Sequence, residues 1–238
     1  MLKIENLTKK FGDKVAVDGI SIEVEAGQIC AFIGHNGAGK TTTLRCIAGI
    51  TGFEEGEITI DEISIKSNPI EAKKLIAYLP DNPELYEHLK GIDYLNFIAD
   101  VFKIDKETRQ KRIEDYARRL EIYKDLGYPI SSYSHGMKQK LALVSALLHT
   151  PKLLLLDEPF VGLDPNASYH FKQIMNELAL SGTAIFYSTH VLEVAEKLCS
   201  HVVIIKNGKL VESGKMEEVR GKKSLESLFL ELENETNN

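Results

Sequence analysis

Residues 29–41 read ICAFIGHNGAGKT, five apolar residues followed by a glycine-rich loop that ends in Lys40 and Thr41. A short, continuous apolar run of this kind is typical of a strand that is covered on both faces, as in a mainly parallel sheet. The segment after the loop is expected to be helical from about Lys40. A strand, a glycine-rich loop and a helix in this order predict an α/β fold.

The glycine-rich loop has the composition of a phosphate-binding loop. Its glycines let backbone N–H groups approach a polyphosphate that a Cβ would block, and the N-terminus of the following helix adds partial positive charge. Lys40 supplies an ammonium for the terminal phosphates, and the Thr41 hydroxyl is a hard ligand for Mg²⁺. The predicted nucleoside triphosphate site consists of Gly34, His35, Asn36, Gly37, Ala38, Gly39, Lys40, Thr41 and Thr42.

A second apolar run, residues 153–159, reads LLLLDEP and ends in two acidic residues and a proline. Kinases, GTPases and motors share the phosphate loop, so this second half of the site decides the reaction. At the C-terminal end of a strand in an open α/β sheet, carboxylates lie in the ligand crevice. One carboxylate, Asp157, is expected to hold the Mg²⁺ shell, and Glu158 to act as base or polariser for an attacking water. The alternative is a structural acidic turn.

His190 follows a third apolar run, residues 184–187, through Ser188 and Thr189. Taken alone, a histidine is more often a surface or core residue than a catalytic one. Its expected place at a C-terminal strand end, one strand beyond the acidic pair, favours a catalytic role.

Residues 133–137, YSHGM, precede a long helix predicted from Lys138 to about His149. Ser134 and the backbone of Gly136, at the N-terminus of this helix, would form a second anion site. The alternative is that Ser134 is only a helix cap. A phosphate site this far from the first is explained best if it serves the nucleotide of another subunit.

The remaining patterns define the fold class. Residues 20–24 and 57–61 alternate as half-exposed antiparallel strands do, Asn207-Gly208 signals a hairpin, and apolar residues recur at helical spacing between about Glu84 and Leu126. We predict an α/β fold with a P-loop NTPase core, a mainly parallel sheet, an antiparallel β subdomain and an inserted helical subdomain. Within one domain, the expected limits are 1–83 and 151–214 for the α/β lobe, 84–150 for the helical lobe and 215–238 for a short helical tail.

Composition excludes several classes of protein. The 238 residues are 43% hydrophobic and 27% charged, and the net charge of −6 implies no nucleic-acid partner. No apolar run approaches the roughly 18 residues of a membrane helix, and the N-terminus lacks a signal sequence, so a cytoplasmic protein is expected. Cys30, Cys46 and Cys199 lack metal or disulfide spacing and are expected to be small buried hydrophobes.

In chain order, these motifs resemble those of the ATP-binding cassette family over about residues 1–214. Walker A matches residues 34–41, and Walker B matches residues 153–157. The other matches are aromatic Phe11 before the first turn, the signature at Ser134, His135, Gly136 and Met137, the catalytic carboxylate Glu158, the D-loop at Gly162, Leu163 and Asp164, and the switch histidine His190.

The resemblance implies the ATP-hydrolysing subunit of a transporter whose membrane permease is a separate protein. It also implies a head-to-tail dimer of identical or different cassettes, with each ATP between the Lys40 loop of one subunit and the Ser134 segment of the other. Phe11 would stack on adenine. ATP would close the dimer and hydrolysis would open it, on the cytoplasmic face of the membrane.

The sequence departs from the family pattern at two places. In the signature, usually Leu-Ser-Gly-Gly-Gln, His135 replaces the first glycine and Met137 the glutamine, while Ser134 and Gly136 are retained. The glutamine that the family places near Mg²⁺ falls at Asp81, which ligates Mg²⁺ with a shorter reach and added charge. Asn82 takes this role instead if the loop is shifted by one residue, and the sequence leaves the choice open.

The loop at residues 80–83, PDNP, and the signature resemble the branch that partners drug, antibiotic and ion exporters. The rival interpretation is a soluble cassette ATPase acting on a ribosome or another macromolecule. Such relatives typically carry two cassettes or a long coiled coil, and this chain has one cassette and no heptad run. The sequence does not indicate the cargo, the direction of transport or whether the partner cassette is identical.

Overall fold

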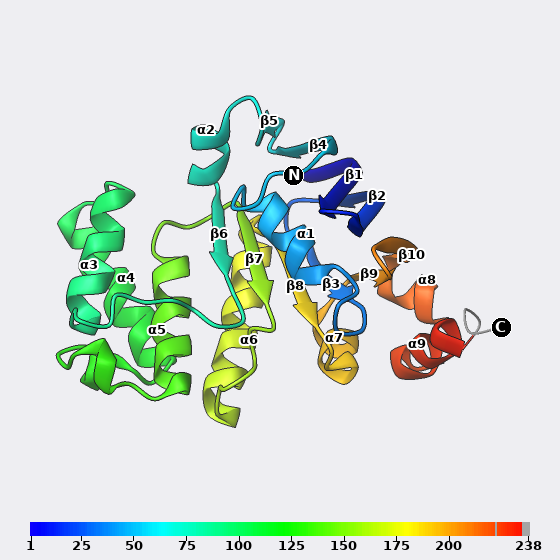
Figure 1. Ribbon diagram of the computed structural model, residues 1–238. Helices are drawn as coiled ribbons and strands as arrows, with labels where there is room; N and C mark the ends of the chain where they lie inside the picture. The colour runs from blue at the N-terminus through cyan, green and yellow to red at the C-terminus, as the bar shows by residue number, and fades with distance from the viewer. Residues whose placement is uncertain (222, 235–238) are drawn as a thin grey trace.

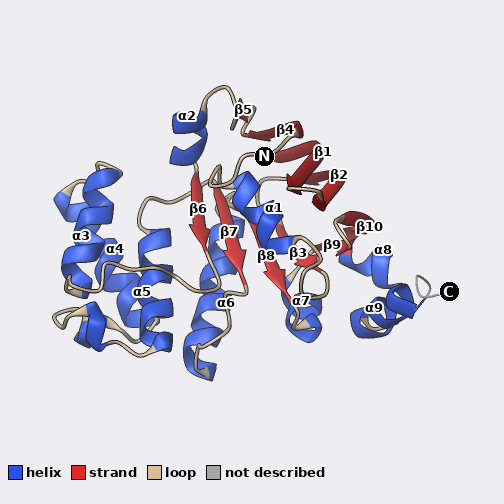
Figure 2. Cartoon of the chain, viewed as in Figure 1, coloured by secondary structure: helices blue, strands red, loops and turns tan. Residues whose placement is uncertain are grey.

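Two sheets, one small and antiparallel and one larger and mainly parallel, form the β-structure (Figures 1 and 2). The computed structural model describes residues 1–221 and 223–234. The small sheet consists of β1 (Leu2–Phe11), β2 (Lys14–Val24), β4 (Glu55–Ile60) and β5 (Ile63–Ser64). The larger sheet consists of β3 (Ile29–Ile33), β6 (Ile76–Leu79), β7 (Leu153–Asp157), β8 (Ala184–Thr189), β9 (His201–Lys206) and β10 (Lys209–Lys215). Their orders are β2-β1-β4-β5 and β10-β9-β3-β8-β7-β6.

The apolar runs of the sequence form the centre of the larger sheet. Every residue of β3, β7 and β8 is buried, and β3 pairs in parallel with β8 on one side and β9 on the other. Strand β7 pairs in parallel with β8 and β6. Strands buried on both faces need no alternation of polar residues, so the prediction of a mainly parallel sheet is confirmed.

The alternating segments and the hairpin signal are confirmed as well. Strands β2 and β4 both pair antiparallel with β1. Asn207 and Gly208, with φ of 50° and 80°, form the turn between the antiparallel strands β9 and β10. Positive φ at both central residues is what a two-residue hairpin turn requires.

Helices cover both faces of the larger sheet and gather in a separate group beyond β6 (Figure 1). Leu44 packs with Phe32 of β3 on one face, and Phe171 packs with Ala31 on the other. The helices are α1 (Lys40–Ile47), α2 (Pro69–Lys74), α3 (Gly91–Val101), α4 (Lys106–Arg119), α5 (His135–Leu147), α6 (Pro165–Leu180), α7 (Leu192–Leu198), α8 (Met216–Arg220) and α9 (Leu225–Asn234), with short 3₁₀ turns at Tyr123–Asp125 and Ile130–Ser132.

Helices α3, α4 and α5 form the helical subdomain, inserted between β6 and β7. In α4 the residues at helical spacing turn inward: Ile113 and Ala117 are buried, as is Leu120 directly after the helix. The fold class is thereby confirmed, while the lobe limits at residues 84 and 150 stay a prediction. Of the predicted tail, 215–238, residues 222 and 235–238 lie outside the described residues.

Two smaller points concern the cysteines and the membrane. Cys30, Cys46 and Cys199 are free and buried, and burial raises the pKa of the Cys46 thiol to about 11. They are the small buried hydrophobes that the sequence predicted. Within residues 1–221 and 223–234, no helix has both the length and the apolar character needed to cross a membrane.

Candidate active site

The predicted catalytic segments meet at the carboxyl edge of the larger sheet. Strands β3, β8 and β7 are neighbours and run parallel, so their C-terminal ends lie at one edge. The pairing sets Ile33 opposite Thr189 and Asp157 opposite Ser188. The glycine-rich loop follows β3, Glu158 follows β7 and His190 follows β8, so three segments distant in the chain become adjacent.

The glycine-rich loop needs glycine at two of its positions. A Cβ at Gly34 would lie 2.5 Å from the carbonyl oxygen of Ile205, and one at Gly39 would lie 2.6 Å from that of Ala16. Gly39 also has a φ of 110°, which other residues rarely adopt. Helix α1 begins at Lys40 without a side-chain cap and without an acidic residue in its first turn, so its first N–H groups point to a ligand site.

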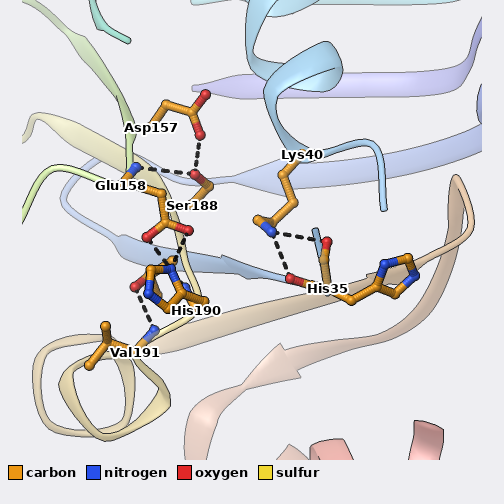
Figure 3. Close-up of polar contacts among 9 residues, drawn as sticks. His35, Lys40, Asp157, Glu158, Ser188, His190 and Val191 are labelled. Atoms are coloured by element: carbon orange, nitrogen blue, oxygen red, sulfur yellow. Dashed lines mark hydrogen bonds and ion pairs between the residues drawn. The ribbon is translucent and has the colours of Figure 1, made fainter. Parts of the chain in front are cut away.

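Lys40 is held inside this loop. Its ammonium donates to the carbonyl oxygens of Gly34 at 2.6 Å and His35 at 3.2 Å (Figure 3), and the residue is 7% exposed. Burial lowers the pKa of this ammonium, while the carboxylates of Glu158 and Asp157 act in the opposite direction. A buried cation held by neutral carbonyls next to two carboxylates is placed to bind an anionic phosphate.

The loop opens into a cavity of about 520 Å³. The cavity-lining residues that the sequence predicted are Phe11, Asn36, Gly37, Gly39, Lys40, Thr41, Thr42, Asp81, Asp157 and Glu158. Gly34, His35, Ala38 and His190 are not among the lining residues, although the first three belong to the same loop. The lining residues that the sequence analysis missed are Lys14, Val15, Ala16, Asn207 and Gly208.

The Asn207-Gly208 turn reaches the cavity because β9 lies next to β3. The N–H of Gly208 donates to Ala38 O at 2.9 Å, and its carbonyl accepts from Asp18 N at 2.8 Å. The turn therefore braces the glycine-rich loop against the start of β2. The Asn207-Gly208 pattern predicts the hairpin, but the position of the hairpin next to the cavity depends on strand order, which no local pattern reveals.

Asp157 is a buried carboxylate with one unsatisfied oxygen. It is 2% exposed, and the Ser188 hydroxyl donates to Oδ1 at 2.5 Å, whereas Oδ2 has no hydrogen-bond partner (Figure 3). A buried oxygen without a partner costs free energy, so this atom fits a cation ligand. The described residues contain no cluster of three His, Cys, Asp or Glu side chains that could hold a metal.

Glu158 and His190 are in direct contact, as Figure 3 shows. The Nδ1 atom of His190 lies 3.0 Å from Oε1 of Glu158, and the His190 backbone N–H donates to Oε2 at 3.4 Å. The Glu158 N–H points to the carbonyl and hydroxyl oxygens of Ser188, at 3.2 and 3.3 Å. Glu158 also has a φ of 50°, an uncommon backbone conformation that turns the chain sharply after β7. Ser188 thus orients the Asp157 carboxylate and holds the backbone of Glu158, a role that the sequence analysis missed.

The Ser134 segment lies outside this cavity. The prediction that its helix begins at Lys138 was wrong: α5 runs from His135 to Leu147, because the Ser134 hydroxyl caps it by accepting from Met137 N at 3.3 Å. Ser134 is exposed and does not line the cavity. A single chain therefore brings together the Lys40 loop, the acidic pair and His190, but not the second predicted anion site.

Of the two candidates in the loop after β6, only Asp81 lines the cavity. Both Asp81 and Asn82 are exposed. In the predicted D-loop, Asp164 caps α6 by accepting from Ala167 N at 2.9 Å, and its other oxygen lies 2.6 Å from the Lys140 ammonium. The Ala167 N–H and then Lys140 lower the pKa of the Asp164 carboxyl.

The chain was compared with known proteins. The model of the family described as ABC transporter matches residues 17–161. An uncharacterized ABC transporter ATP-binding protein of Methanocaldococcus jannaschii is 40% identical over 218 residues, which are 92% of this chain and 79% of that protein. The ABC-type transporter ATP-binding protein EcsA of Bacillus subtilis is 34% identical over 99% of this chain and 97% of its own length.

Solved structures agree with this assignment. The structure of an ATP-binding subunit of an ABC transporter has a TM-score of 0.94 and 32% identity, covering 98% of this chain and 99% of its own. The same fold extends to cassettes of lower identity, such as a dimeric post-hydrolysis cassette with a TM-score of 0.82 and 23% identity. The chain belongs to the ABC transporter family, in which it is an ATP-binding subunit and an ATPase.

Proposed function

We propose that this ATPase drives transport through a separate membrane permease, with two cassettes that close on two molecules of ATP. The observation that carries the proposal is the separation of the two phosphate-binding segments. The Lys40 loop lines the cavity with Glu158, whereas the Ser134 segment of the same chain does not. In a head-to-tail dimer, the Ser134 segment of one subunit would complete the site of the other.

The cavity-lining residues that the sequence predicted have proposed tasks toward ATP. Phe11 is 54% exposed at the cavity and offers a ring face for adenine, with the Lys9 ammonium 4.9 Å from its centroid. The N–H groups of residues 36–42 and the Lys40 ammonium bind the phosphates. When bound, Mg²⁺ would neutralise phosphate charge, and Thr41, Asp157 and Asp81 are the residues proposed to hold it.

Glu158 is the proposed base or polariser of the attacking water. Its side chain is 15% exposed, and both carboxylate oxygens contact His190, one through the imidazole Nδ1 and the other through the backbone N–H. This contact fixes the carboxylate at the sheet edge beside Lys40, so its orientation is set before a nucleotide arrives. His190 is thereby a positioning residue for Glu158 and is proposed to sense the γ-phosphate next to it.

The Ser134 hydroxyl is proposed to donate a hydrogen bond to a phosphate of the nucleotide bound by the partner cassette. It accepts the Met137 N–H, and a hydroxyl that accepts one bond still has a proton to donate. The first N–H groups of α5, at His135 and Gly136, precede the one that Ser134 satisfies. Together these donors form the proposed second anion site, which holds the dimer closed while ATP is intact.

The proposed permease contact is the surface of residues 81–87 and the helical subdomain. Tyr86 is 53% exposed and Phe97 is 45% exposed, with ring centroids 5.8 Å apart, and Tyr94 lies 6.2 Å from Tyr86. Exposed aromatic rings that contact one another form an apolar surface suited to a partner helix. The segment is tied to α5 by an ion pair between Glu87 and Lys138. It would couple the permease to the Ser134 segment.

The proposal places the subunit on the cytoplasmic face of a membrane. The rival function, a cassette that acts on a ribosome or another macromolecule, is tested by cross-linking from cysteines placed at Leu85 or Tyr86. Capture of an integral membrane protein supports the transporter, and capture of ribosomal proteins supports the rival.

The dimer is tested with Glu158→Gln, which is nearly isosteric and removes the negative charge beside the γ-phosphate. Hydrolysis is expected to fall on the order of 10²–10⁴-fold, while ATP binding is retained or improved. Light scattering with and without ATP should then detect an ATP-dependent dimer. A Glu158→Gln protein that binds ATP but stays monomeric, alone and with its permease, contradicts the proposed closure.

A further inference from the structure

The start of α5 and the loop before α6 meet backbone against backbone. A Cβ at Gly136 would lie 2.5 Å from the carbonyl oxygen of Gly162, so only glycine fits there without a shift. Gly162 has a φ of 80°, and a Cβ on it would lie 2.8 Å from Cδ2 of the His135 imidazole. The ring of His135 therefore closes over Gly162, and the two segments leave no space for a side chain between them.

An ion pair fastens the same two segments one turn further along α5. The Lys140 ammonium lies 2.6 Å from Oδ2 of Asp164, and the Lys140 side chain is 12% exposed. The other oxygen of Asp164 accepts the Ala167 N–H at 2.9 Å and caps α6. One carboxylate thus joins the second turn of α5 to the first turn of α6. The Asp164 side chain is 44% exposed, so water screens this pair in part, and its role here is geometric: it fixes the position of Asp164 relative to α5.

The loop between Glu158 and Asp164 is held in place by backbone hydrogen bonds and by packing of one side chain. Its backbone forms successive tight turns, from Val161 N to Glu158 O at 3.2 Å and from Leu163 N to Phe160 O at 3.3 Å. The Phe160 ring anchors these turns in the core, 5.7 Å from the ring of Phe171 and 6.1 Å from that of Tyr187. A displacement of Asp164 is therefore transmitted to Glu158 instead of being absorbed.

We infer that Lys140 and His135 are positioning residues, which couple the Ser134 segment to the catalytic carboxylate Glu158 of the same subunit. The inference rests on the proposed function, in which Ser134 binds ATP of the partner cassette and Glu158 acts on the subunit's own ATP. When partner ATP fixes the start of α5, the contacts to Gly162 and Asp164 fix the loop that carries Glu158. Each site then becomes active only when the other is occupied, which makes hydrolysis cooperative in ATP.

The test compares Lys140→Met with Asp164→Asn in the full chain. Both remove the ion pair, but asparagine is as good a helix cap as aspartate, so Asp164→Asn keeps α6 intact. We expect each to lower kcat about 10- to 100-fold, because a small misplacement of a catalytic group has an effect of this size. The Hill coefficient for ATP should fall toward one, while ATP affinity measured by calorimetry stays unchanged. The double variant should be no worse than either single variant.

Three further variants complete the test. Lys140→Arg keeps the charge and should retain most of the activity and the cooperativity. Lys152→Met removes an exposed pair with Asp61 and should change nothing. His135→Gly, which opens the contact over Gly162, should lower the Hill coefficient less than Lys140→Met does.

The outcomes separate this inference from the proposed function. If the Lys140→Met and Asp164→Asn proteins keep the wild-type kcat and Hill coefficient, the coupling is refuted. A wild-type Hill coefficient of one with an intact ATP-dependent dimer also refutes the coupling but leaves the dimer standing. Absence of the dimer in Glu158→Gln alone refutes the closure on which both depend.

Discussion

The N-termini of two helices, α1 and α5, differ in how they can bind phosphate. Helix α1 begins after Gly39 with no side-chain cap and with the Lys40 ammonium folded back on its own loop. Helix α5 begins after Ser134, whose hydroxyl accepts the Met137 N–H. The first start lines a cavity of about 520 Å³, whereas the second is exposed and lines none of it.

The difference shows which half of the site depends on a ligand. At α1 the first N–H groups have no side-chain cap, and the buried Lys40 ammonium is held by two neutral backbone carbonyls, so phosphate can bind both. At α5 the cap already exists, and the helix is stable without nucleotide. The N-terminus of α1 is therefore expected to determine the affinity for ATP, and the N-terminus of α5 the affinity of one cassette for another.

The largest effect is expected from Lys40→Ala, which removes the buried cation at the first helix start. Loss of a preorganised charge at the γ-phosphate should lower turnover on the order of 10²–10³-fold and weaken ATP binding. Calorimetric titration with ATP and a phosphate-release assay measure the two effects. The matched change Lys197→Ala removes an exposed lysine that pairs with Glu193 on α7 and should leave both unchanged. Unaltered ATP affinity in Lys40→Ala would show that the first start does not hold the phosphates.

A smaller effect is expected at the second helix start from Ser134→Asp. Aspartate caps a helix as well as serine does, so the free energy of unfolding should change by less than about 0.5 kcal/mol. A carboxylate facing a phosphate is repelled, so dimer affinity in the Glu158→Gln background should fall on the order of 10²-fold. Light scattering with ATP measures the dimer.

The control for this change is Ser224→Asp, because the Ser224 hydroxyl accepts the Ser227 N–H at the start of α9 in the same way. It should leave the dimer intact. Ser134→Ala sharpens the comparison further: it should cost about 1 kcal/mol of stability through the lost cap but weaken the dimer less than aspartate does. A Ser134→Asp protein that still dimerises would show that the N-terminus of α5 does not bind a phosphate in the dimer.

The smallest effect concerns the loop after β6, where Asp81 lines the cavity and Asn82 does not. If Asp81 contacts the Mg²⁺ shell, Asp81→Ala should raise the Mg²⁺ concentration for half-maximal hydrolysis about tenfold, at the low end for such contacts. Asn82→Ala should leave it unchanged. Titration of the phosphate-release rate with Mg²⁺ distinguishes them, and the reverse pattern would assign the role to Asn82.

The sequence predicted the parts of the site that depend on local patterns. Continuous apolar runs located β3, β7 and β8 because strands buried on both faces contain few polar residues. It missed Asn207 and Gly208 at the cavity, because their place there depends on β9 lying next to β3. It missed Ser188 because a serine inside an apolar strand has no signature of its own until Asp157 is seen opposite it.

The start of α5 was misjudged for a related reason. Residues 135–137 include a glycine and a histidine, which are weak helix formers, yet all three belong to α5. The Ser134 cap and the packing of Gly136 against Gly162 outweigh that weak preference. Propensity is a small term when a cap and a tertiary contact act on the same turn.

The central position of β3 also sets the order in which the two sheets can form while the ribosome synthesises the chain. Both neighbours of β3, β8 and β9, come late in the chain, so after Ile33 is made, synthesis must continue to Thr189 before a first partner exists. The small sheet pairs β1 with β2 and β4 and is complete once Ser64 has emerged. The nascent chain therefore folds its antiparallel sheet early and holds the apolar β3 unpaired through most of translation. Nucleotide cannot assist these early steps, since the loop that binds it follows β3, which has no partner strand until β8 has been made.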